Sequence, residues 1–202
     1  MKIIVCILLL LAAVGCRHKG PVEIIGTVNW GEYSECQLFI LDGDKRDSLF
    51  VDGQTGSILY RLECDTPGIV VLRGVVGTDQ DKWPFEQALY VEPGAKIRVD
   101  ISFRNRRAEM VVDKKDRNNA ALIAYNRFNL DKSRSIWEKA PGASELKNCM
   151  EEFYIRLDDV TGEFKPSGMV KKYLDIQAYL SFVQALDGVA YMYSKNEERI
   201  PD

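Results

Sequence analysis

The stretch LYVEPGAKIRVDI, residues 89–101, decides the fold class. In its second half Ile97, Val99 and Ile101 alternate with charged neighbours, and a Pro-Gly pair stands just before them. Apolar residues that recur with a period of two are typical of a half-buried β-strand, and Pro-Gly marks a turn. The stretch therefore predicts strand, turn and strand.

The same period extends outward from this stretch to most of the first half of the chain. Alternating strands are predicted over 22–30, 58–64, 85–91 and 97–103, and more fully buried strands over 38–41 and 69–76. Asp-Gly or Pro-Gly turn signals separate them at 42–43, 52–53, 67–68 and 93–94. This spacing of short strands and turns is typical of an antiparallel sandwich.

After Asp116 the pattern becomes that of helices. Apolar residues between Leu146 and Leu157 lie three, four and seven positions apart, which places them on one helix face. This helix is predicted to begin after Pro141-Gly142 and to stop near Thr161-Gly162. Two more helices are predicted over 118–130 and 169–193, with a loop at 165–168.

Together these patterns predict an α+β fold: an N-terminal antiparallel β-sandwich-like domain (22–113) followed by an approximately three-helix region (114–196). Residues 197–202 are predicted to be a C-terminal tail or a truncated linker.

The N-terminus has the pattern of an export signal. Lys2 precedes an apolar run over 3–14, which is the length of a signal-peptide core and not of a membrane span. Small residues then lead into Cys16, an arrangement that resembles the bacterial lipobox. We expect a signal peptide over 1–15, lipidation at Cys16 and an acylated tether over 16–21; the alternative is a buried N-terminal strand or helix that contains a cysteine.

The lipidated cysteine would make membrane lipid a partner of the chain. In the lipoproteins that this N-terminus resembles, acidic residues at this point direct the protein to the cell surface, whereas the tether here is basic. The expected location is therefore the bacterial cell envelope, with a lipid anchor and the folded part facing the periplasm.

Composition excludes several function classes. The formal net charge is -3, and it becomes -4 without residues 1–15, which hold Lys2 as their one charged residue. A nucleic-acid partner is therefore not expected. The single histidine, His18, lies in the tether, so Ser-His and Cys-His catalysis and His-ligated zinc are not expected either. No catalytic residue, metal site or cofactor is predicted.

Three cysteines remain besides Cys6 and Cys16, and none is part of a Cys-x-x-Cys motif. Cys36 and Cys64 lie on predicted strands, where they form either a structural disulfide or two buried free thiols. Cys149 lies in the apolar stripe of its helix, where a free thiol packs as a small hydrophobic group.

Three further stretches contain residue types that occur in binding sites. Asp42, Asp44 and Asp47 faintly suggest a calcium loop, but the required glycine and bidentate glutamate are missing, so a solvated turn is predicted. The basic stretch 104–117 contains acidic residues and is predicted to be solvated, with contact to anionic lipid as the alternative. Aromatic residues of the β-domain are predicted to pack, with Trp83-Pro84-Phe85, in an expected exposed loop, as the candidate surface for a glycan or peptide.

The lipobox, the sequence Ile25-Gly26-Thr27-Val28, the stretch 52–58 (DGQTGSI) and LYVEPGAKIRVDI over 89–101 form a combination that resembles a known family. It is similar to the N-terminal region of Bacteroidetes thiol-disulfide interchange lipoproteins of the TlpA-like kind, over roughly residues 16–195. In that family a small β-domain of unassigned function and a helical segment precede a thioredoxin-like domain, which has no counterpart in this sequence.

The function expected from these observations is that of a membrane-anchored, non-catalytic interaction or accessory module, linked to periplasmic thiol-disulfide exchange. Its broad apolar helices are expected to be buried against the sandwich or against a protein partner, and self-association through them is also expected. The alternative is the N-terminal portion of a thioredoxin-like oxidoreductase whose catalytic domain is absent from this chain.

Overall fold

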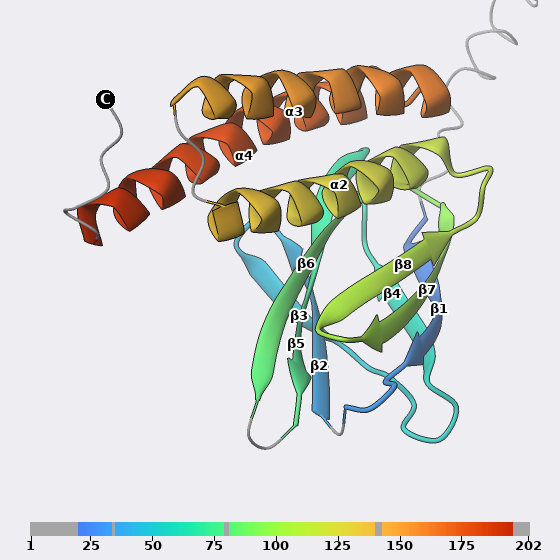
Figure 1. Cartoon of the computed structure of the whole chain (residues 1–202). Coiled ribbons are helices and arrows are strands. Elements are labelled where there is room, and N and C mark those ends of the chain that lie inside the picture. Colours follow the sequence, from blue (N-terminus) through green and yellow to red (C-terminus); the bar gives the residue numbers. More distant parts are fainter. Residues whose placement is uncertain (1–19, 34, 79–80, 140–142, 196–202) are drawn as a thin grey trace, which may run out of the picture. The chain divides into compact units, whose positions relative to one another are not determined.

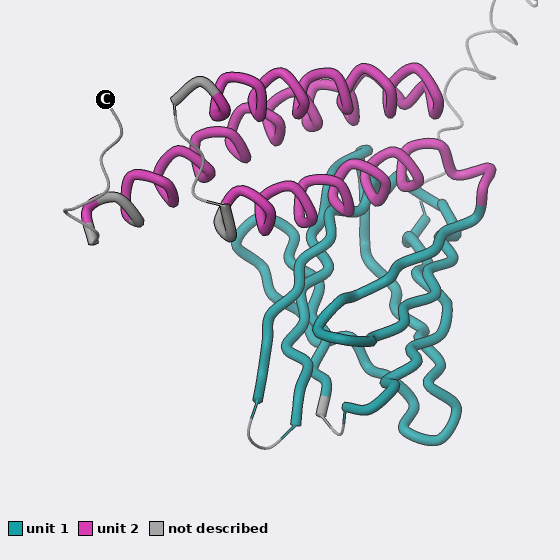
Figure 2. The backbone as a smooth tube through the Cα atoms, in the orientation of Figure 1, with its two compact units in different colours: residues 1–113 teal, residues 114–202 magenta. Residues whose placement is uncertain are grey.

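The computed structural model describes residues 20–33, 35–78, 81–139 and 143–195. The chain divides into two compact units, residues 1–113 and 114–202, coloured separately in Figure 2. Strands make up the regular structure described in the first unit and helices that of the second (Figure 1). The predicted α+β fold, a β region followed by helices, is confirmed. The predicted signal peptide, Cys16 and the tail at 197–202 lie outside the described residues.

The first unit contains two four-stranded sheets in its described part. One sheet has the order β4-β1-β7-β8, with β4 at Ser57–Leu62, β1 at Val22–Asn29, β7 at Lys96–Arg104 and β8 at Arg107–Val112. The other has the order β3-β2-β5-β6, with β3 at Lys45–Leu49, β2 at Glu35–Asp42, β5 at Gly68–Gly77 and β6 at Lys82–Val91. The Pro-Gly turn at 93–94 carries the chain from the second sheet to the first, because β6 and β7 belong to different sheets.

One strand pair differs from the antiparallel prediction: β1 and β7 run parallel, with Gly26 opposite Val99. The two backbones approach so closely here that a Cβ at Gly26 would lie 1.7 Å from the Val99 carbonyl oxygen. The other pairs of named strands are antiparallel. A parallel partner for β1 requires a strand far along the sequence, which a local period cannot reveal.

Alternation along the strands builds the core of the first unit. In β5, Val70, Leu72 and Val76 are buried whereas Arg73 and Val75 are exposed. The stretch 69–76 thus alternates like its neighbours and is not buried throughout as predicted. The buried apolar residues contributed by the other strands are Val22, Ile24, Val28, Leu38, Ile40, Leu49, Ile58, Phe85, Leu89, Val91, Ile97, Val99, Ile101, Phe103 and Met110.

The second unit consists, where described, of α2 (Arg117–Lys139), α3 (Ala143–Phe164) and α4 (Gly168–Lys195). Each helix packs against the other two. One core cluster is formed by Ile136, Phe153, Ala185 and Val189, with Phe128, Leu146 and Cys149 beside it. None of these described helices combines the length and the apolar character that crossing a membrane requires.

Capping residues explain where the helices begin. The Asp116 carboxylate accepts a hydrogen bond of 3.0 Å from the Asn119 N–H at the start of α2, and the Ser167 hydroxyl accepts one of 3.5 Å from the Val170 N–H at the start of α4. Such side chains satisfy N–H groups that lack a partner in the first helical turn. The Asn118 side chain also accepts a hydrogen bond of 2.8 Å from the Ser167 N–H, which joins the beginnings of α2 and α4.

Two helix ends differ from the prediction. α2 continues to Lys139, beyond the expected end at Leu130, because no glycine or proline interrupts the sequence before 141. Gly162 does not end α3, which runs to Phe164. Lys165 then adopts a positive φ of 49° and Pro166 follows, and a proline cannot continue a helix.

Candidate functional site

The candidate surface Trp83-Pro84-Phe85 lies on β6, not in an exposed loop as expected. Phe85 has 9% of its area exposed and packs edge-on against Phe103 at a centroid distance of 5.1 Å. Trp83 contacts the same Phe103 ring at 5.9 Å and Tyr33 at 6.0 Å. Of the three residues only Pro84 is exposed, so the aromatic side chains pack, as predicted for this domain, and do not form the alternative platform for a glycan or peptide.

The aromatic cluster is held by its backbone and by polar contacts. Gly74 leaves room for the Phe85 ring, because a Cβ there would lie 2.0 Å from a ring carbon. The Tyr33 hydroxyl accepts a hydrogen bond of 2.7 Å from the Arg106 N–H, and the Arg106 side chain forms an ion pair with Asp81. The Trp83 indole N–H is buried without a partner among the described residues.

The basic stretch 104–117 also has a structural explanation. Asn105 and Arg106 have φ values of 52° and 56° and form the two-residue turn between β7 and β8. Positive φ at both central residues is the geometry of the common hairpin turn. Arg106 forms an ion pair with Asp81, and Arg117 belongs to α2 and not to the strands. The stretch therefore does not form a continuous basic patch on one element.

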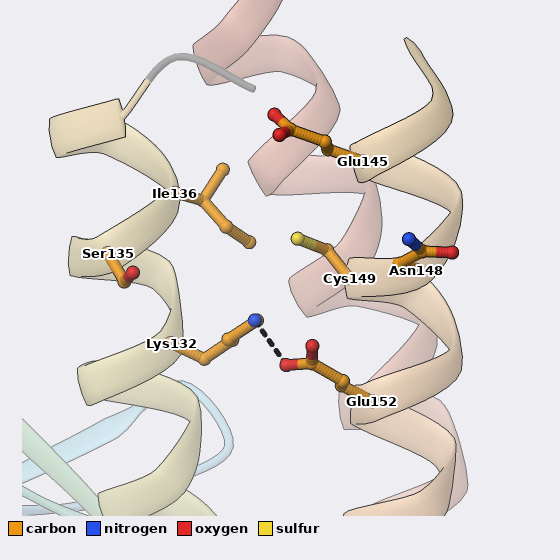
Figure 3. Close-up of a pocket in the computed structure, with 7 residues that line it drawn as sticks. All are labelled: Lys132, Ser135, Ile136, Glu145, Asn148, Cys149 and Glu152. Carbon is orange, nitrogen blue, oxygen red and sulfur yellow. Dashed lines mark ion pairs between the residues drawn. The ribbon is translucent and has the colours of Figure 1, made fainter. Parts of the chain in front are cut away.

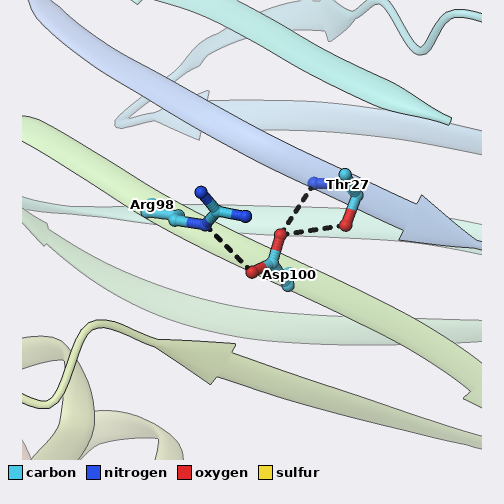
Figure 4. A network of polar contacts seen from close by, with 3 residues as sticks. All are labelled: Thr27, Arg98 and Asp100. Atoms are coloured by element: carbon cyan, nitrogen blue, oxygen red, sulfur yellow. Dashed lines mark hydrogen bonds and ion pairs between the residues drawn. The ribbon is translucent and has the colours of Figure 1, made fainter. Parts of the chain in front are cut away.

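A polar network lies between the parallel strands (Figure 4). The Thr27 N–H and hydroxyl both donate to Asp100 Oδ1, at 3.1 and 2.9 Å, while Arg98 Nε donates to Asp100 Oδ2 at 3.1 Å. Burial raises the pKa of Asp100, but the bonds from Thr27 and Arg98 outweigh it and hold the pKa below its ordinary value. Because these contacts use both carboxylate oxygens, the role of Asp100 is structural: it connects β7 to β1 through Thr27.

The acidic turn shows the arrangement of a hairpin. All three carboxylates are exposed: Asp42 ends β2, Asp44 lies in the turn and Asp47 lies on β3. The Tyr60 hydroxyl donates a hydrogen bond of 2.8 Å to the Asp47 carboxylate. In the part of the chain that the structure describes, neither these nor other residues gather into a group that could hold a metal ion.

Cys36, Cys64 and Cys149 are free in the structure. Cys36 lies opposite Val76 near one end of β5, whereas Cys64 precedes Gly68, where β5 begins. Eight residues of strand at about 3.3 Å each separate Gly68 from Val76 by about 26 Å. The four residues from Gly68 back to Cys64 can shorten this separation by at most about 14 Å.

At least about 12 Å therefore remains between Cys36 and Cys64, beyond the Cα separation of about 7 Å that a disulfide tolerates. Of the two alternatives that the sequence left open, the structure has the free thiols, because the two residues lie at opposite ends of β5. Burial raises the pKa of the Cys36 thiol to about 12. Burial also raises the pKa of Cys64, whose thiol donates a hydrogen bond of 3.0 Å to the Thr66 carbonyl.

The helical unit contains a hollow of about 220 Å³ between α2 and α3. Figure 3 shows Cys149 directed toward Ile136, with the ion pair of Lys132 and Glu152 beside it. Reactive thiols lie beside free cations or helix N-termini, whereas Lys132 is already paired and Cys149 follows the first turns of α3. The thiol therefore serves packing, as the sequence suggested, and the hollow lacks a nucleophile with an activating base.

A second hollow of about 420 Å³ lies between α2 and α4, with Ser133, Gln184 and Asp187 on its wall. It opens to solvent and its wall offers no set of converging donors of the kind that orients a small ligand.

Tyr125 of α2 is 2% exposed and its hydroxyl has no partner among the described residues. Burial raises the pKa of this hydroxyl above its ordinary value.

The largest unexplained feature of the helical unit is one side of α4, named here the outer face. It carries exposed apolar residues, with 50% of Ile176 and 58% of Tyr179 accessible. A soluble surface seldom exposes a contiguous row of large apolar residues unless something binds it. The outer face comprises Met169, Ile176, Tyr179, Leu180, Val183 and Leu186.

The opposite side of α4 is already covered. Ala178, Ser181 and Ala185 are buried there, and small residues at this spacing let helices approach closely. α4 is thus apolar on two sides, and its own bundle uses one of them. The sequence predicted apolar helices that need a partner, but it did not identify the outer face. The signal for it is the spacing of seven residues between Met169, Ile176 and Val183.

Comparison with known proteins adds no relative. No family model matches the chain, and neither a curated protein nor a solved structure does. The function must therefore be inferred from the residues and their geometry.

Proposed function

We propose that this protein is a membrane-anchored envelope lipoprotein whose folded part is a non-catalytic interaction module facing the periplasm. The observation that carries the interaction role is the outer face of α4, an exposed apolar row on a helix whose other side is already packed. The hollows and the described cysteines offer no arrangement for group transfer, which is consistent with this role.

The anchor rests on the sequence around Cys16. A lipidated cysteine gains about 0.8 kcal/mol for each methylene that enters the membrane, so several acyl chains hold a protein there almost permanently. The link to thiol-disulfide exchange rests on the resemblance to TlpA-like lipoproteins, in which a β-domain and a helical segment stand before the redox domain.

The second candidate is the N-terminal portion of a thioredoxin-like oxidoreductase. The order of a β-sandwich unit and a helical unit, which is the order found in the family that the sequence resembles, favours this candidate. In that case the module would position a catalytic domain encoded beyond Asp202.

Intact-mass analysis with thiol labelling, on protein purified from its native membrane, tests both candidates. An acylated Cys16, with no thiols beyond Cys36, Cys64 and Cys149, is the result expected for an anchored module. A larger mass with an additional reactive dithiol assigns the chain to a redox enzyme. An unmodified N-terminus at Met1 contradicts the lipoprotein proposal, and Cys16→Ser serves as the control that must lose the acyl mass.

A further inference from the structure

The outer face of α4 has the periodicity of a helix-pairing seam. Met169, Ile176 and Val183 follow one another at intervals of seven residues, and Ala190 continues the series. Tyr179 and Leu186 form a second series of the same interval. An apolar repeat of seven residues keeps one side of a helix in contact with a second helix along its length.

We propose that the outer face of α4 binds α4 of a second copy of this chain, in antiparallel orientation. The inference rests on the proposed function and names the partner of the interaction module. The arrangement is a symmetric dimer in which each copy contributes the same surface.

The positions of the apolar residues are self-complementary. When the two-fold axis passes between Tyr179 and Leu180, Tyr179 of each copy lies opposite Leu180 of the other. Ile176 lies opposite Val183 in the same way, and Met169 opposite Ala190. Three apolar pairs therefore form on each side of the axis or across it, and Leu186 lies opposite Tyr173, an aromatic residue at the edge of the face.

The charged positions obey the same symmetry. Lys172 and Asp187 lie on the outer face among its apolar residues, seven positions before Tyr179 and seven after Leu180, and neither forms an ion pair within the described part of the chain. The antiparallel arrangement places Lys172 of one copy opposite Asp187 of the other, twice in each dimer. A parallel arrangement would instead place Lys172 opposite Lys172 and Asp187 opposite Asp187, which is unfavourable.

A membrane surface fits the outer face less well. Helices that lie in the membrane interface carry lysine and arginine on the side away from the lipid. The side of α4 opposite the outer face instead holds Ala178 and Ala185 and is buried in the bundle. Acylation still promotes the dimer, because two copies confined to one membrane have a raised effective concentration.

Disulfide crosslinking of the full chain in its native membrane tests this dimer. Two tagged chains, one with Lys172→Cys and one with Asp187→Cys, are co-expressed and treated with a mild oxidant. We expect a crosslinked heterodimer when both chains are present. Neither variant alone is expected to crosslink, because two copies of position 172 lie fifteen helical residues apart, about 22 Å at 1.5 Å per residue.

The controls separate this result from accidental oxidation. Lys171→Cys, one residue away but on another side of α4, must not crosslink with Asp187→Cys, and the unaltered chain must remain monomeric on the gel. Crosslinking of each single variant with itself would show a parallel pair and overturn the proposal. No crosslink in any combination would assign the outer face to the β-sandwich unit, the membrane or another protein, and would equally overturn it.

A matched pair of isoleucine variants gives a second measurement. Ile176 and Ile155 are both exposed isoleucines, but Ile155 lies on α3 away from the outer face. Ile176→Asp is expected to reduce the heterodimer yield at least tenfold, whereas Ile155→Asp leaves it unchanged, with equal helical circular dichroism in both. Equal yields from the two variants would contradict the proposal.

Membrane pelleting of the wild type and of Cys16→Ser, run on the same samples, reports the anchor independently of the crosslink. Crosslinking without membrane association refutes the anchored module and leaves the dimer standing. Membrane association without crosslinking refutes the dimer and leaves the anchored module standing.

Discussion

Asp100 shows what one carboxylate contributes to this fold. It is bound by two groups of Thr27 on β1 and by Arg98 on its own strand β7. The charged form of the carboxylate is the form that these donors stabilise, so the stability it supplies depends on pH.

Asp100→Asn is expected to lower the free energy of unfolding at pH 7 by about 1 kcal/mol, because the hydrogen bonds to a charged acceptor are weakened and the pair is partly exposed. The pKa of Asp100 is below its ordinary value of 3.8 in the folded state. Its contribution is therefore complete above that value and is lost as the pH falls through the folded pKa.

Urea unfolding at pH 7 and at pH 3 measures this difference. The wild type and Asp100→Asn should differ at pH 7 and converge at acid pH, while Glu109→Gln on the exposed side of β8 should match the wild type at both. An undiminished difference at pH 3 would mean that Asp100 acts through packing and not through its charge.

The cysteines give the second prediction at this scale. We expect alkylation of the folded protein at pH 8 to be slow at Cys36, whose pKa of about 12 keeps it protonated. After unfolding without reductant, Cys36, Cys64 and Cys149 should all take the label, as read by peptide mass spectrometry. A disulfide between Cys36 and Cys64 would instead leave both unlabelled until reductant is added.

Among the elements, the parallel pair of β1 and β7 depends on one glycine. Gly26→Ala is expected to lower the free energy of unfolding by about 2–4 kcal/mol, because the new Cβ collides with the Val99 carbonyl and the strands must separate. Gly53→Ala, where a Cβ would meet nothing within 4 Å, should change stability by no more than about 0.5 kcal/mol. Urea midpoints compare the two, and equal losses would show that the close approach is not required.

The parallel pair of β1 and β7 also shows which features of these elements the sequence predicts and which it does not. Alternation and turn residues locate six of the eight described strands but not β3 or β8, and caps locate the helix starts, since both signals are local. The end of α2 lies nine residues beyond the expected Leu130. Which strands become neighbours depends on contacts such as Gly26 with Val99, far apart in the sequence. The expectation of an exposed loop at Trp83-Pro84-Phe85 failed for a related reason: the burial of Phe85 depends on Gly74 and Phe103, which no local pattern connects to it.

At the scale of the whole molecule, the chain is built from two compact units that meet near residue 113. Lys114 and Lys115 lie in an exposed turn at this boundary. Limited trypsin digestion is expected to cut there first and to leave a resistant fragment from each unit, because cleavage needs a backbone that can open locally. Lys45 and Arg46, equally exposed but on strand β3, should be cut later; earlier cutting there would show that the sandwich opens more readily than the boundary.

The position of Pro84 has a consequence for the aggregation of the protein. β6 is the last strand of its sheet and has β5 on one side only, so its outer backbone is open to pairing with strands of other molecules, the first step of amyloid-like aggregation. A proline has no N–H with which to extend such a pairing. The residue that the sequence suggested as part of a ligand surface is therefore expected to hinder pairing along an edge strand of ten residues.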